Sequence, residues 1–180
     1  MADRKNQIVD AATALFIDEG LTVSTAKIAK AAGVSNGTLF NVFASKQVLI
    51  DTIYADAKQA MYAAIPNSGD VCVSRETVRE NWDSYLAWAR KFPKDREIIH
   101  LLLEAGLVSD RARAEVEAAG ADLGSWLEKG LNQGVLRGPN VSYVAQLIFF
   151  QINLVITEDL EGRDVDLAFD MLCNSIGLTK

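Results

Sequence analysis

The most restrictive feature of this 180-residue chain is the segment of residues 24–43, where two short apolar patterns meet at Gly33-Val34-Ser35. Glycine adopts the left-handed conformation that ends a helix sharply, and serine accepts hydrogen bonds from the free amides of a following helix. Val34 would fill the angle between the two helices. Leu39 and Phe43, spaced i and i+4, would fasten the second helix to a core. The segment therefore predicts two short helices joined by a tight turn.

Helical spacing of apolar residues continues along the chain, which contains only three prolines. No segment alternates as a strand would, so we expect an all-α protein. Serine or asparagine caps and glycine stops mark the ends of most of the predicted helices. The helices are expected over residues 5–19, 24–32, 35–43, 45–65, 74–92, 94–105, 109–133, 140–159 and 164–177, with a loop over residues 66–73.

The second short helix would present a polar side made of Asn36, Gly37, Thr38 and Asn41. Its side chains are small near its start, so the helix could enter a DNA major groove as the recognition helix of a helix-turn-helix does. The alternative is a simple helical hairpin inside a bundle, which a glycine turn alone would not exclude.

The net charge of −6 does not by itself favour nucleic acid, because phosphate attraction needs local positive charge. Residues 1–50 carry five Lys or Arg against four acids, a net of +1, while residues 51–180 carry thirteen against twenty, a net of −7. The acidity lies outside the first segment, so the argument for DNA binding depends on the motif.

The motif extends well beyond the turn. It comprises Ala11-Ala12, Leu15-Phe16, Glu19-Gly20, the run Ile28-Ala29-x-Ala-Ala-Gly-Val-Ser-x-Gly-Thr-Leu-Phe, Phe43-x-Ser-Lys and Leu49. In type and spacing this resembles the tetracycline-repressor (TetR) family of regulators over residues 8–49. The resemblance implies an N-terminal three-helix DNA-binding domain with a helix-turn-helix, over residues 1–46, and a C-terminal helical ligand-binding and dimerisation bundle over residues 47–180.

The resemblance also implies roles for single residues. Thr25 and Thr38 would contact phosphates, Lys46 would be a cationic phosphate anchor, and Asn36, Gly37 and Asn41 would lie near base edges. Ser35 and Phe40 complete the predicted DNA-binding set. The family usually has Tyr where Phe40 stands and often Tyr-His where Asn41-Val42 stand, so we expect an unusual operator preference and modest affinity.

The helix expected over residues 140–159 is apolar around almost its whole circumference, which is typical of a helix buried on all sides. In a chain of this length, a second subunit could supply the outer cover, and we expect a homodimer. The alternative is a central helix of a monomer. The predicted interface residues are Tyr143, Leu147, Phe150, Leu154, Phe169 and Leu172.

The resemblance further implies a pocket for a small, partly apolar effector in the helical body. Aromatic content and polar groups in apolar surroundings suggest candidates for its lining. For any single one of these residues, packing in the core is the competing interpretation. The candidates are Tyr54, Met61, Trp82, Tyr85, Trp88, His100, Trp126, Phe149 and Asn153.

One histidine and two widely spaced cysteines do not make a usual zinc or Cys-His site, so we expect no metal, no cofactor and no enzyme activity. No signal peptide or membrane span is visible, and we expect a cytoplasmic protein. The predicted function is a ligand-responsive regulator, a repressor, that binds operator DNA as a homodimer. The alternatives are an interaction protein of this fold and a ligand-binding module, with weak or no DNA binding.

Overall fold

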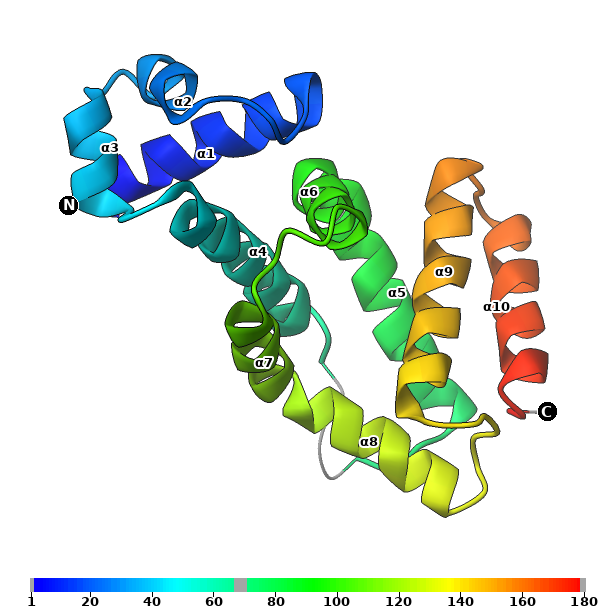
Figure 1. Cartoon of the computed structure of the whole chain (residues 1–180). Coiled ribbons are helices and arrows are strands. Elements are labelled where there is room, and N and C mark those ends of the chain that lie inside the picture. The colour runs from blue at the N-terminus through cyan, green and yellow to red at the C-terminus, as the bar shows by residue number, and fades with distance from the viewer. Residues whose placement is uncertain (1, 67–70, 179–180) are drawn as a thin grey trace. The chain divides into compact units, whose positions relative to one another are not determined.

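The computed structural model describes residues 2–66 and 71–178, and in these residues the chain is helical without strands, which confirms the all-α prediction (Figure 1). Residues 67–70 of the predicted loop lie outside the described residues. The helices are α1 (Ala2–Glu19), α2 (Thr25–Ala31), α3 (Asn36–Val42), α4 (Lys46–Ala63), α5 (Arg75–Lys91), α6 (Pro93–Glu104), α7 (Asp110–Ala119), α8 (Ala121–Asn132), α9 (Val141–Thr157) and α10 (Arg163–Ser175).

Side-chain caps fix the starts of most of these helices, as predicted. The Ser35 hydroxyl accepts from the Thr38 amide at 3.0 Å, and the Asn140 carbonyl oxygen accepts from the Tyr143 amide at 2.9 Å. Such bonds satisfy amides that have no partner within their own helix. The side chains that accept them belong to Ser24, Ser35, Ser45, Ser74, Ser109 and Asn140.

The single helix predicted over residues 109–133 is wrong, because the chain leaves the helical conformation at Gly120 and forms α7 and α8. The backbone of Gly120 has φ −94° and ψ 10°. A Cβ atom on this residue would lie only 2.4 Å from the ring of Tyr62, so a larger residue here would have to displace that ring. Helical periodicity alone did not reveal the break.

The described helices form two compact units. The first comprises residues 2–60 and 92–118, and the second comprises residues 61–66, 71–91 and 119–178. In the first unit, α1 packs against α2 and α6, and α2 packs against α3. Its core includes the fully buried side chains of Ile8, Phe16, Ile28, Leu39, Leu49, Ile98 and Leu102. The division at residue 46 into two functional domains stays a prediction.

In the second unit, α9 packs against α5, α8 and α10. Its core contains the buried side chains of Trp82, Trp126, Leu136, Ile152, Val155 and Leu172. Although α9 is the most apolar helix, no helix among the described residues is both long and apolar enough to cross a membrane.

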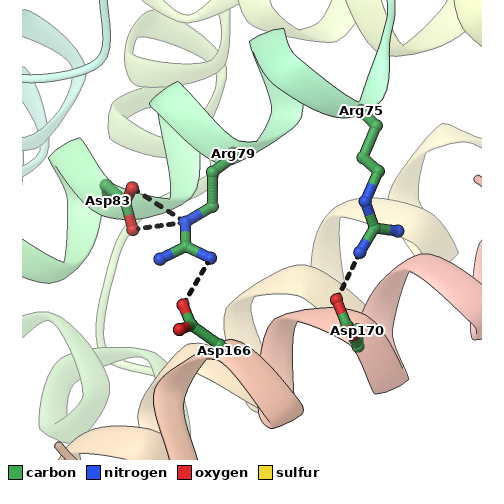
Figure 2. A network of polar contacts seen from close by, with 5 residues as sticks. All are labelled: Arg75, Arg79, Asp83, Asp166 and Asp170. Atoms are coloured by element: carbon green, nitrogen blue, oxygen red, sulfur yellow. Dashed lines mark hydrogen bonds and ion pairs between the residues drawn. The ribbon is translucent and has the colours of Figure 1, made fainter. Parts of the chain in front are cut away.

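Two arginines of α5 join α10 through a polar network (Figure 2). Arg79 donates from Nε to both carboxylate oxygens of Asp83, at 2.9 and 2.8 Å, and pairs with Asp166 of α10 at 2.8 Å. Arg75 pairs with Asp170. Both guanidinium groups lie over the ring of Phe169, at 5.2 and 5.0 Å from its centroid. The network covers a buried aromatic ring with cations, and sequence periodicity had not predicted it.

Candidate nucleic-acid interface

The helix-turn-helix predicted from the sequence is present in the first unit. Helix α2 ends at Ala31, Gly33 follows with φ +67°, and the amide of Val34 donates back to the carbonyl of Ala29 at 3.0 Å. The left-handed conformation of Gly33 turns the chain sharply, so α3 can begin only three residues later, at Asn36. Leu39 and Phe43 are 0% and 2% exposed, and they attach α3 to the core as predicted.

The opposite side of α3 is exposed and carries no charge. Asn36, Gly37 and Asn41 are exposed, and the side chains of Phe40 and Val42 are 43% and 37% exposed. Nothing in the first unit covers these side chains, so this side of α3 is available to a partner.

Gly37 is not required by the fold of the unit. Its φ is not in the left-handed region, and a Cβ atom added to it would meet only the Ser35 hydroxyl at 3.8 Å, an ordinary contact. Glycine within a helix costs stability relative to alanine. Packing within the unit therefore does not explain the glycine at this position.

The predicted phosphate contacts at the helix starts have different surroundings. Thr25, the first residue of α2, and Thr38 are half-buried. The Thr38 hydroxyl is 2.8 Å from that of Ser35, and its amide already donates to the same oxygen. The hydroxyl still has capacity to accept or donate one further bond, which keeps a phosphate contact feasible.

Lys46 is partly used within the unit. Its ammonium donates to the backbone carbonyl of Leu21 at 2.6 Å and lies 5.5 Å from the centroid of the Phe16 ring. Partial burial lowers the pKa of this amine from its ordinary value. An ammonium has three donors, so a phosphate contact is still possible, but Lys46 also holds the start of α4 against the α1–α2 connection.

Other cations near the motif are also engaged. Lys27 pairs with Glu19, and Lys5 pairs with Asp56 at 3.1 Å. Lys30, at the end of α2, is exposed and has no ion pair within the described residues. The positive charge that could attract phosphates at long range is therefore small, in agreement with the weak charge asymmetry of the sequence.

The predicted effector-pocket residues are divided between the two units. Tyr54, which is buried, and His100, which is half-buried, belong to the first unit. The others belong to the second unit, where Met61, Trp82, Tyr85, Trp88 and Trp126 are buried and Phe149 and Asn153 are half-buried.

Within the second unit, part of this set is brought together. The Tyr85 ring lies 5.6 Å from that of Trp88 and 6.0 Å from that of Phe149, between centroids. Trp126 does not need a ligand for its indole N–H, which donates to the carbonyl of Val71 at 3.0 Å. The amide of Asn153 donates to the carbonyl of Phe149 at 2.9 Å in its own helix. The aromatic cluster of α5 and α9 is thus the best-formed part of the predicted lining.

The predicted dimer residues fall into two groups. Tyr143, Phe150 and Leu154 of α9 are 54%, 61% and 55% exposed, and Leu147 is half-buried. In contrast, Phe169 and Leu172 are 3% and 1% exposed, so they belong to the core of their own chain and the prediction placed the wrong face of α10 outward.

The apolar residues of α10 that do face outward are Leu167 and Met171, at 58% and 56% exposure. Their i and i+4 spacing was visible in the sequence. The apolar residues of α10 do not by themselves tell which side meets α5, so the sequence left the choice open.

Taken together, a capped glycine turn and an exposed, uncharged second helix identify α2 and α3 as a helix-turn-helix. Residues 8–53 match the family model described as bacterial regulatory proteins, tetR family. The resemblance to the TetR family found in the sequence is thereby confirmed for this N-terminal segment.

Solved structures extend the likeness of the fold to the whole chain. A putative tetR family transcription regulator from Shewanella sp. PV-4 is similar with TM-score 0.83 and 22% identity, over 96% of this chain and 97% of that one. A TetR family transcription regulator from Marinobacter aquaeolei VT8 gives TM-score 0.82, 20% identity and coverage of 97% and 96%. Flavonoid-responsive regulator FrrA gives TM-score 0.65 and 21% identity, over 97% of each chain.

Proposed function

We propose that this protein is a ligand-responsive transcriptional repressor that binds operator DNA as a homodimer and leaves it when a small effector binds. The observation that carries the proposal is the exposed, uncharged side of α3 in a helix-turn-helix that belongs to a family of regulators. In such proteins this helix lies in the major groove.

On DNA, we assign Asn36, Gly37 and Asn41 to the base edges, and Thr25 and Thr38 to phosphates. Ser35 caps α3 and so orients its amides. Lys46 would add a phosphate contact from the start of α4, and Phe40 would lie in the groove beside Asn41. Hydroxyl and amide groups fix the register of the protein on the duplex, while base edges supply specificity.

The homodimer is proposed from a surface of the second unit that we name the α9/α10 face: Tyr143, Phe150, Leu154, Leu167 and Met171. All five side chains are more than half exposed and large. Clusters of exposed apolar residues of this kind mark interfaces, and a twofold axis would pair the face with its own copy.

Sedimentation equilibrium of Leu154→Glu tests the dimer. We expect a shift from dimer to monomer, because the buried interface would contain an unpaired charge. Val71→Glu is the matched control, since Val71 is also an exposed apolar residue of the second unit but lies outside α9 and α10. If the Leu154 variant stays dimeric, the α9/α10 face is not the interface.

The effector is assigned to the second unit, next to the Tyr85, Trp88 and Phe149 rings. A cluster of aromatic rings favours a partly apolar ligand, and one regulator of the same fold is named for its response to flavonoids. Titration with a flavonoid should quench tryptophan fluorescence and weaken operator binding. The operator should weaken flavonoid binding by the same factor. Ligand binding without any change in operator affinity would contradict the proposed response.

Gly37→Ala tests the DNA-binding surface most directly. The added methyl group meets nothing closer than 3.8 Å, so the free energy of unfolding should be unchanged or slightly higher. We expect operator affinity to fall roughly tenfold or more, because a methyl group would separate the start of α3 from the duplex. Gly124→Ala in α8, where a Cβ atom also meets nothing within 4 Å, is the control that should leave binding intact.

A second candidate function is a protein-interaction module of this fold without DNA binding. It is favoured by the phenyl ring of Phe40, which offers no hydroxyl to a phosphate, and by the net charge of −6. Binding to random duplex, measured over a series of salt concentrations, separates the two functions. A DNA-binding protein loses affinity steeply as salt rises, while a protein that does not bind DNA shows no association at low salt.

A further inference from the structure

The exposed side of α3 lacks the groups that read G·C pairs. Arginine and lysine are the common readers of guanine, and aspartate and glutamate accept from cytosine. No such residue is present in α3, whose sequence is Asn-Gly-Thr-Leu-Phe-Asn-Val. What the helix presents instead is amide and apolar surface.

The order of these residues around the helix is informative. Residues four apart share one line along a helix, so Gly37 and Asn41 lie together at the centre of the exposed side. Phe40 and Val42 lie on either side of that line, and their side chains are 43% and 37% exposed. A central amide is thus flanked by two apolar groups, with glycine leaving space at the start of the helix.

This combination matches the major-groove edge of A·T pairs. An asparagine side chain pairs with N6 and N7 of adenine, and apolar side chains contact the C5-methyl group of thymine. Exposed apolar surface on an otherwise polar helix gains free energy when a methyl group covers it. The adenine N6 and N7 atoms and the thymine methyl group lie on the same edge of the A·T pair. A short run of A·T pairs could therefore offer contacts to Phe40, Asn41 and Val42 together.

We propose that α3 reads A·T pairs in the operator half-site, with Asn41 on an adenine and with Phe40 and Val42 against the methyl groups of neighbouring thymines. The inference rests on the proposed DNA-binding function and names the sequence class that the function requires. It also fits the electrostatics of the first unit, where Lys5 and Lys27 are ion-paired, Lys46 donates to the Leu21 carbonyl, and Lys30 is the exposed cation of the motif without an ion pair among the described residues. With so few cations for phosphates, base contacts would supply a larger share of the affinity.

The test begins with selection of bound duplexes from a random library by the full chain. In the selected half-site, each thymine is then replaced singly by uracil, which lacks only the methyl group. We expect A·T pairs at the centre of each half-site, and a roughly three- to tenfold loss of affinity for uracil at one or two positions. Replacing the contacted adenine by 7-deazaadenine, which lacks N7, should cause a similar loss.

The variants assign the loss to residues. Val42→Ala and Phe40→Ala should each bind the thymine and the uracil duplex with equal affinity at one position. Asn41→Ala should bind the adenine and the 7-deazaadenine duplex with equal affinity. Val48→Ala is the matched control, because Val48 is 43% exposed but lies on α4, and it should keep every difference.

Failure of this inference differs from failure of DNA binding itself. A selected site rich in G·C, or equal affinity for thymine and uracil at all positions, would overturn the A·T assignment while salt-dependent duplex binding survives. If no duplex binds at any salt concentration, the A·T assignment and the proposed function are both wrong.

Discussion

The Phe169 ring between Arg75 and Arg79 allows a quantitative test of what holds α10 to α5. The ring is 3% exposed, both guanidinium groups lie within 5.2 Å of its centroid, and the Trp82 ring meets it edge-on at 5.6 Å. Phe169→Leu keeps an apolar side chain but removes all three ring contacts. Each cation contact is worth about 0.5–1 kcal/mol and the aromatic contact about 0.5–1.5 kcal/mol, so we expect the free energy of unfolding to fall by about 1.5–3.5 kcal/mol.

A double-mutant cycle isolates one of these contacts. Arg79→Met also removes the ion pairs with Asp83 and Asp166. The side chains of these two aspartates are more than half exposed, so each pair contributes about 0.2–1 kcal/mol. Because these pairs are present with or without the ring, their contribution cancels in the cycle. We expect a coupling of about 0.5–1 kcal/mol between Arg79 and Phe169.

Urea denaturation followed by tryptophan fluorescence is a suitable assay, since all three tryptophans, Trp82, Trp88 and Trp126, belong to the second unit. The matched control is a cycle of Phe169→Leu with Arg90→Met, because Arg90 lies on the same helix but donates to the carbonyl of Leu160. Its coupling to Phe169 should be near zero. If the two cycles give the same coupling, the cations over the ring do not stabilise this packing.

Two further predictions concern the stability of each unit. In α8, Gly130→Ala should destabilise the second unit by about 1–3 kcal/mol, because the new Cβ would lie 2.7 Å from the buried side chain of Leu136. Gly124→Ala, in the same helix, should stabilise the unit by about 0.5–1 kcal/mol. If urea denaturation shows that both variants change the free energy of unfolding in the same direction, the packing argument is wrong. In the first unit, burial lowers the pKa of Lys58 from 10.5 to about 8, against the opposing charge of Glu117. The unfolded state then binds more protons between these values, so stability should rise with pH across that window by at most about 3 kcal/mol, and Lys58→Met should flatten the rise in denaturation curves followed by circular dichroism.

Local chemistry made the helix-turn-helix predictable. The Ser35 cap, the glycine turn and the spacing of Leu39 and Phe43 act over three or four residues, so they can be read directly from the sequence. The same holds for the other serine caps and for the exposed side of α3. These features do not depend on any distant part of the chain.

Features that depend on distant partners were missed. The break at Gly120 lies beside the ring of Tyr62, and the inward side of α10 contacts Arg75 and Trp82 of α5. Likewise, Lys46 shares its ammonium with the carbonyl of Leu21. In each case the local sequence was compatible with more than one arrangement. The arrangement found in the structure involves a residue that is distant in the sequence.

Helical glycines show how this distinction bears on function. In the sequence, Gly37 and Gly130 are both glycines inside helical segments, where alanine would be more stable. The structure gives Gly130 a reason, since Leu136 and Val73 occupy the space of its Cβ. It gives Gly37 none, because the nearest atom, the Ser35 hydroxyl, is 3.8 Å away. Packing within the described chain therefore does not explain Gly37, just as it does not explain Gly124 of α8. The two differ in position, since Gly37 lies on the exposed, uncharged side of α3 that we propose to contact DNA, and the pair of Gly→Ala variants separates an open helical position from a contact with the duplex.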